Sequence, residues 1–206
     1  MKKSISSIAF LFFISLSLFA APNPKGMIIR DTDTLHVTFI IPVTGPNYPN
    51  LQDSVRYLDA LDNECYLSPE DAKEYCFEHK GKLIRMVSCV NTLSLDPSRP
   101  LQIFLHLVLD GPLKLFKHYT RGTSGAPGSA TQGGAPAMYG SGQSNTYLLK
   151  MNVEDMVYYD DMNFKKDIPV FFEKCTTLVK MIEDKIYLKR DIEEIVNYYN
   201  TKCGSN

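Results

Sequence analysis

Two histidines in the middle of the chain are the residues whose type and spacing point to chemistry. His106 and His118 stand in two apolar runs, 101–109 and 113–119, which a short polar turn joins. If the runs form a β-hairpin with a loop of residues 110–112, both imidazoles fall on the even-numbered face, about 7 to 8 Å apart along a diagonal. Such a pair could hold a transition-metal ion, although the sequence offers no third ligand.

The alternative is that both histidines are structural. Their even-numbered neighbours Phe104, Val108 and Phe116 make an apolar setting that the C-terminal helices could cover. Buried there, each imidazole would be neutral and would need a hydrogen-bond partner rather than a substrate. We therefore expect structural roles for His106 and His118, and we assign no catalytic, cofactor-binding or metal-binding residue and no cofactor.

The apolar pattern of the two runs predicts the register of this hairpin. The odd-numbered positions from 101 to 115 are aliphatic except for Gly111 in the turn. Because strand side chains alternate faces, pairing Leu109 with Leu113 and Leu107 with Leu115 keeps these residues on one dry face. Pro112 then lies in the loop, where its missing N–H costs no ladder bond.

The N-terminus has the pattern of a signal peptide. Two lysines precede an almost wholly apolar stretch from Ile5 to Phe19, and the small residues Ala20 and Ala21 follow. A run of about 15 residues is short for a membrane-spanning helix, which needs about 20. We expect residues 1–20 to be the signal peptide, with cleavage after Ala20 or Ala21 and no membrane span afterwards. No cysteine follows the run to carry a lipid, so the mature protein should be secreted or periplasmic.

Charge and motifs exclude several classes of function. Removing Lys2 and Lys3 with the signal peptide leaves 20 of the 22 basic residues against 23 acidic ones, a net charge of −3. No basic cluster suits a nucleic acid, so we expect no nucleic-acid partner. The sequence also lacks P-loop, Gly-x-Ser-x-Gly, His-Glu-x-x-His and Rossmann motifs, which makes an enzyme less expected.

Five cysteines would meet an oxidising compartment. They are Cys65, Cys76, Cys89, Cys175 and Cys203, and none belongs to a Cys-x-x-Cys motif. Cys175 and Cys203 stand at the two ends of a predicted antiparallel helix pair, which returns the chain near its start, so we expect a disulfide between them. An odd number leaves at least one thiol free or intermolecular, and the pairing of the other three stays open.

The remaining elements follow from periodicity and turn residues. Residues 27–41 and 75–90 predict two further hairpins, the second turning at Lys80 and Gly81. Ser68 should begin a short helix, and residues 42–61 should be irregular. Residues 122–146 are uncharged and hold seven of the 12 glycines, so we expect a flexible loop rich in Gly, Ser, Ala and Pro.

The C-terminal part changes to helical spacing. Strands at 147–151 and 156–159 precede three apolar groups with helical spacing between residues 164 and 199. An antiparallel sheet built from hairpins, followed by two or three C-terminal helices packed on it, defines the predicted fold class, α+β. Residues 21–206 should form a single domain.

The order of these elements resembles a family of uncharacterised exported proteins of Gram-negative bacteria. The matching segments are residues 25–29 with Asp33 and Thr34, residues 67–70 leading into 75–78, residues 109–111 followed by 115–119, and residues 195–200 with Cys203. No activity is established for that family. The resemblance therefore implies an exported location and a fold type, and it transfers no catalytic residue.

These observations favour a non-enzymatic envelope or secreted interaction module, with an envelope protein or glycan of unknown identity as its partner. A second hypothesis is a hydrolase or metal-dependent enzyme with its site on the His106 and His118 face. A third is an accessory subunit of an outer-membrane or surface complex.

Overall fold

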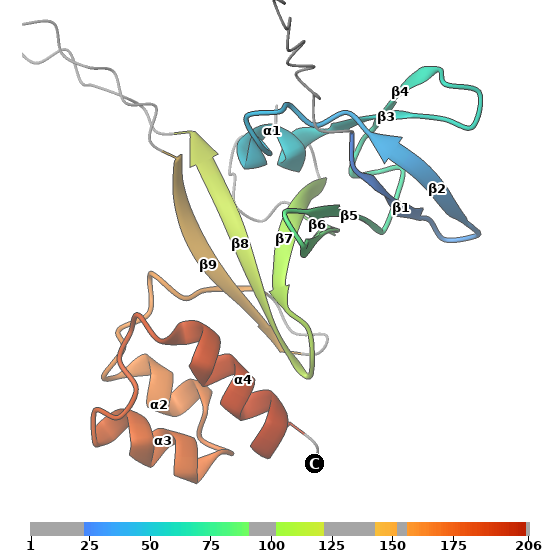
Figure 1. Ribbon diagram of the computed structural model, residues 1–206. Coiled ribbons are helices and arrows are strands. Elements are labelled where there is room, and N and C mark those ends of the chain that lie inside the picture. Colours follow the sequence, from blue (N-terminus) through green and yellow to red (C-terminus); the bar gives the residue numbers. More distant parts are fainter. Residues whose placement is uncertain (1–22, 91–101, 122–142, 152–155, 205–206) are drawn as a thin grey trace, which may run out of the picture.

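One antiparallel sheet runs through the whole molecule (Figure 1). The computed structural model describes residues 23–90, 102–121, 143–151 and 156–204, and within them ten strands lie in the order β10-β9-β8-β7-β6-β5-β1-β2-β3-β4. The strands are β1 (Lys25–Ile29), β2 (Thr34–Phe39), β3 (Val55–Leu58), β4 (Glu64–Leu67), β5 (Glu74–His79), β6 (Lys82–Val90), β7 (Gln102–Leu109), β8 (Leu113–Arg121), β9 (Gln143–Met151) and β10 (Val157–Tyr158). The helices are α1 (Tyr48–Asp53), α2 (Asp167–Phe171), α3 (Thr176–Glu183) and α4 (Ile192–Lys202). This architecture confirms the predicted α+β class.

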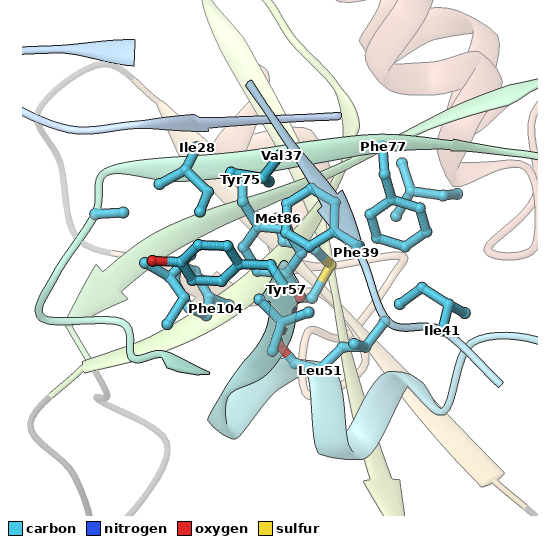
Figure 2. Packing of buried hydrophobic residues seen from close by; sticks show 14 residues of the cluster. Ile28, Val37, Phe39, Ile41, Leu51, Tyr57, Tyr75, Phe77, Met86 and Phe104 are labelled. Carbon is cyan, nitrogen blue, oxygen red and sulfur yellow. Dashed lines mark hydrogen bonds between the residues drawn. The ribbon is translucent and has the colours of Figure 1, made fainter. Parts of the chain in front are cut away.

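The first hydrophobic core fills the space between strands β1 to β7 and the short helix α1. Figure 2 shows its aromatic centre, where the ring of Phe39 lies 5.4 Å from Tyr75 and 5.6 Å from Phe77. The buried Tyr75 hydroxyl donates to the Leu51 carbonyl of α1 at 2.8 Å. A six-residue helix is too short to be stable alone, so these tertiary contacts hold α1 in place.

A second core joins the C-terminal helices to β8 and β9. Leu113, Leu115 and Leu149 on these strands pack against buried residues of all three helices, among them Leu178 and Ile195. In Figure 1 the helices lie at the end of the molecule remote from α1. The predicted packing of C-terminal helices on the sheet is thus confirmed. None of the helices in the described ranges has the length and apolar character to cross a membrane.

The two other predicted hairpins also form. β1 pairs with β2, and β5 pairs with β6 around Lys80 and Gly81. Both turn residues have positive φ angles, 52° and 72°, as a two-residue turn of the type that matches strand twist requires.

The central hairpin forms with the predicted loop, but its predicted register is wrong, by two residues at Leu109 and by one residue from Leu107 onward. Leu109 pairs with Leu115, whereas Leu107 pairs with Phe116 and His106 with Lys117. The register shifts between Leu107 and Leu109, so β7 carries one extra residue there. An extra residue of this kind moves every side chain beyond it in the strand to the opposite face of the sheet.

The shift divides the odd-numbered leucines between two faces of the sheet. Leu113 and Leu115 face the helices, whereas Ile103, Leu105 and Leu107 pack with Phe116 and Leu148 in a third cluster. Phe104 joins the core beneath α1 instead of a face covered by the C-terminal helices. The single dry face expected from the pattern is therefore two buried faces.

Three local predictions also need correction. Ser68 begins a turn rather than a helix, because the Lys73 N–H already donates to the Ile29 carbonyl of the sheet at 2.9 Å. The segment 42–61, expected to be irregular, holds α1 and β3. Residues 143–146 belong to β9 rather than to the loop. The rest of that loop and the signal peptide with its cleavage site lie outside the described residues.

Candidate functional site

His106 lies on the sheet face that α1 and the C-terminal helices share. Its Nδ1 is 2.8 Å from the Tyr119 hydroxyl of the neighbouring strand. The ring of Tyr48, at the start of α1, stacks on both partners, with centroids 4.4 Å from Tyr119 and 5.5 Å from His106. The short helix therefore covers the histidine with an aromatic ring.

This environment keeps the imidazole neutral. Burial, with a smaller contribution from the positive charge of Lys117, lowers the pKa of His106 to about 4, although the carboxylate of Glu193 acts in the opposite direction. Burial also raises the pKa of Tyr119, so its hydroxyl keeps its proton and can donate to Nδ1. His106 is thus a neutral histidine with a hydrogen-bonded ring nitrogen, which agrees with the hypothesis that its role is structural.

A charged group continues the same face toward α4. Lys117 Nζ lies 4.6 Å from the centre of the Tyr147 ring and 3.4 Å from Glu193 Oε1, and the Tyr147 hydroxyl donates to the same oxygen at 2.9 Å. Burial lowers the pKa of Lys117, but its interactions with Tyr147 and Glu193 outweigh that effect and raise it. We call Tyr48, His106, Lys117, Tyr119, Tyr147 and Glu193 the polar strip.

His118 lies on the opposite face of the sheet. His106 pairs with Lys117, so the next residue of β8 points away from the polar strip. The predicted juxtaposition of His106 and His118 on one face is therefore wrong, and its cause is the extra residue in β7. Within the described ranges, no three side chains of His, Cys, Asp or Glu gather as a metal site would require.

The ladder between β7 and β8 opens beyond this point, and a side chain of α1 takes over its hydrogen bonds. The two strands pair from His106 and Lys117 toward the turn, and Figure 1 shows them diverging toward α1. Gln52, only 2% exposed, donates to the Tyr119 carbonyl at 2.9 Å and accepts from its N–H at 2.6 Å. The carboxamide thus replaces the missing strand partner and fixes α1 at the opening.

Two hollows adjoin this helix on either side of an ion pair. The first, of about 350 Å³, lies between α1 and strands β3 and β4, and its lining includes Asn47, Asn50, Asp53, Arg56, Tyr66 and Arg121. The second, of about 370 Å³, lies at the open end of β7 and β8 and includes Gln52, His118 and Thr120. Both share Asp53 and Arg121, so we treat them as one site, the α1 groove.

Hydrogen bonds hold the polar side chains of the α1 groove in place. Arg121 donates to Asn50 Oδ1 at 2.7 Å and lies 3.7 Å from the Asp53 carboxylate. Arg56 donates to Glu64 at 3.0 Å. The Tyr66 ring extends from β4 and remains 68% exposed. The groove therefore offers planar hydrogen-bonding groups beside an accessible aromatic surface.

One element of this site, helix α1, has a signal in the local sequence. Asn47 caps α1 by accepting from the Asn50 N–H at 3.3 Å, and Pro49 occupies its first turn. A capping residue followed by proline is a helix start that the local sequence shows. The roles of Gln52 and Arg121 depend on contacts across some 70 residues, which no local pattern indicates.

Cys175 and Cys203 are placed for the predicted disulfide. Their Cα atoms are 5.7 Å apart and their sulfur atoms lie at bonding distance, joining the residue before α3 to the end of α4. The other three cysteines, Cys65, Cys76 and Cys89, are unpaired.

Comparison with known proteins identified no relative of this chain. No protein-family model, no curated protein and no solved structure matches the chain. The resemblance to exported proteins of Gram-negative bacteria therefore stays a prediction.

Proposed function

We propose that this chain is an exported, non-enzymatic interaction module that binds its partner through the α1 groove. The observation that carries the proposal is the groove itself, in which Asp53 and Arg121 join two hollows and Tyr66 leaves most of its ring accessible. Binding sites combine a concave surface of a few hundred Å³ with a few oriented polar groups. Tyrosine and arginine are also the residue types that contribute most to binding energy at interfaces.

The polar strip is a weaker candidate because its groups already satisfy one another. His106 bonds to Tyr119, and Lys117 and Tyr147 both contact Glu193. Such a mutually bonded set stabilises the contact of α1 and α4 with the sheet. In the α1 groove, by contrast, the Arg121 side chain is 71% exposed despite its ion pair.

A capture experiment tests the binding surface. The purified protein, immobilised, is exposed to a native envelope fraction, and the bound material is compared with that of an Arg121→Glu variant. Because Arg121 is exposed, the variant should keep its fold, while the reversed charge repels Asp53 and disturbs the groove. We expect it to lose most of the captured partner.

The matched control is Lys180→Glu, a similar charge reversal at an exposed position of α3, at the other end of the molecule. This variant should capture the partner as the unmodified protein does. Equal capture by the Arg121→Glu variant, with its fold intact, would show that the α1 groove is not the binding surface.

The proposed export has its own test. The apolar segment before Ala20 and Ala21 supports a signal peptide, as does the predicted resemblance to exported proteins. Expressed with its own N-terminus in a Gram-negative host, the protein should appear in the periplasm or medium, beginning at residue 21 or 22. Recovery of the uncleaved chain from the cytoplasm, by intact-mass measurement, would contradict this proposal.

A further inference from the structure

We infer that the α1 groove binds a neutral saccharide; this inference rests on the proposed function and names its ligand class. The first argument is charge. Each arginine of the groove already has an acidic neighbour, Arg121 with Asp53 and Arg56 with Glu64 at 3.0 Å. The groove therefore carries no excess positive charge that would attract a phosphate or a carboxylate, and an uncharged ligand suits it best.

The second argument is the geometry of the polar groups. Guanidinium, carboxamide and carboxylate groups are planar and present paired donors or paired acceptors. Arg56, Arg121, Asn47, Asn50 and Asp53 supply all three kinds within one hollow. Neighbouring hydroxyl groups of a sugar ring, each both donor and acceptor, match such pairs two at a time.

The third argument is the aromatic surface. The Tyr66 ring is 68% exposed and lines the same hollow as the planar polar groups. The face of a tyrosine ring is a flat apolar platform, and the C–H bonds on one face of a pyranose can lie against it. A polar groove with one flat aromatic wall therefore fits a ring that is polar at its rim and apolar on its face.

The fourth argument concerns the size of the groove. The two hollows have volumes of about 350 and 370 Å³ and meet at the Arg121 and Asp53 pair. Because the two hollows share these lining residues, a short stretch of a longer glycan suits the site better than a single sugar unit. Tyr66 would contact one ring, and the open end of β7 and β8, with His118 and Thr120, would receive another.

The test uses neutral oligosaccharides as probes. Trimers of glucose in two linkages, of mannose and of N-acetylglucosamine are titrated to about 10 mM, a range that covers weak binding. Ligand-detected saturation-transfer NMR reports contact, and amide chemical shifts of the protein locate it. We expect at least one trimer to bind, with shifts concentrated in α1, β4 and the end of β8.

Two variants of Tyr66 make the test specific. Tyr66→Ala removes the aromatic platform and should weaken binding at least about tenfold, whereas Tyr66→Phe keeps the ring and should stay within about twofold. Leu83→Ala changes a residue that is 63% exposed on β6 and should leave binding unchanged. Binding of none of the trimers, or equal binding by the Tyr66→Ala variant, would overturn the inference.

The two proposals fail in different ways. If the Arg121→Glu variant loses a captured protein while no trimer binds, the groove is a binding site for protein and the saccharide inference falls. If trimers bind and the Tyr66→Ala substitution abolishes this binding, both proposals stand. If neither capture nor trimer binding depends on the groove, both are wrong.

Discussion

At the scale of single residues, burial decides what His106 can do. His106 is covered by the Tyr48 ring and bonded to Tyr119, so it loses hydration in exchange for one hydrogen bond. A charged imidazole would lose more hydration than a neutral one and would also meet Lys117 on the same face. The residue therefore contributes to stability as a neutral group.

This neutrality predicts a pH dependence of stability. The pKa of His106 is about 4 in the folded protein, below the ordinary value near 6.5, so the unfolded chain binds the proton more tightly. Its contribution is complete above about pH 6.5 and is lost as the pH falls toward 4. We expect a loss on the order of 2 kcal/mol between pH 7 and pH 4.5 from this residue.

Urea unfolding at pH 7, 5.5 and 4.5 measures this loss. A His106→Gln variant should be less stable at pH 7, because the contacts with Tyr119 and Tyr48 change, but it should lose less stability on acidification than the unmodified protein. His36→Gln, which removes an exposed histidine of β2, is the control. The same acid loss in the His106→Gln variant as in the unmodified protein would contradict the assignment.

At the scale of elements, two carboxamides fix helices to the same strand. Gln52 of α1 bonds to the N–H and carbonyl of Tyr119, and Asn200 of α4 bonds in the same way to Leu113, with both distances 2.8 Å. Near each end of β8, a carboxamide side chain thus makes the pair of hydrogen bonds that a neighbouring strand would otherwise make. The contact of Asn200 with β8 also requires a glycine at position 111, because a Cβ there would lie 2.6 Å from the Asn200 side chain.

Removing the first of these contacts should destabilise the protein strongly. A Gln52→Ala substitution removes a side chain that is 2% exposed and leaves the partly buried Tyr119 N–H and carbonyl without their partner, at a cost of about 2 to 4 kcal/mol. Asn197→Ala, at an exposed position of α4, should change stability by less than about 0.5 kcal/mol. Chemical denaturation compares the two variants, and a Gln52→Ala cost similar to that of the control would refute the role given to this side chain.

The same elements show which features the sequence could predict. The turn at Lys80 and Gly81 was predictable because a glycine, which readily adopts a positive φ angle, stands between two runs of strand-forming residues. The extra residue of β7 near Val108 was not predictable. Aliphatic residues occupy every odd-numbered position on both sides of it, so the pattern gives no sign of the register shift. The face of His118, and with it the candidate metal pair, depended on that one residue.

At the scale of the whole molecule, one sheet connects three clusters of buried residues, two of which pack against helices. The core beneath α1 involves β1 to β7, and the core beneath the C-terminal helices involves β8 and β9. An ion network also links the two parts: Arg85 of β6 contacts Glu74 at 2.6 Å and Asp110 of the central turn at 2.9 Å, and Lys114 of β8 contacts Asp110 at 2.7 Å. These pairs are partly exposed, so each contributes modestly to stability. Within the helical part, a covalent link adds to the apolar packing.

That link gives the last prediction. Cys175 precedes α3 and Cys203 ends α4, and their bond closes a separation of 28 residues around the second core. In the chain-entropy model a loop of this length stabilises the folded state by about 3 to 4 kcal/mol. A Cys175→Ala and Cys203→Ala double variant should therefore unfold at a clearly lower urea concentration than the oxidised protein.

Reductant separates the covalent effect from the loss of packing. Dithiothreitol should lower the unfolding midpoint of the unmodified protein toward that of the double variant, and it should leave the midpoint of the double variant unchanged. Cys65→Ala, which removes an unpaired and only half-buried cysteine of β4, should respond to reductant as the unmodified protein does. If non-reducing peptide mapping finds Cys175 free, the bond does not form in solution. If the oxidised and reduced proteins unfold at the same midpoint, the bond adds no stability. The second core would then rest on apolar contacts between the helices and Leu113, Leu115 and Leu149 alone.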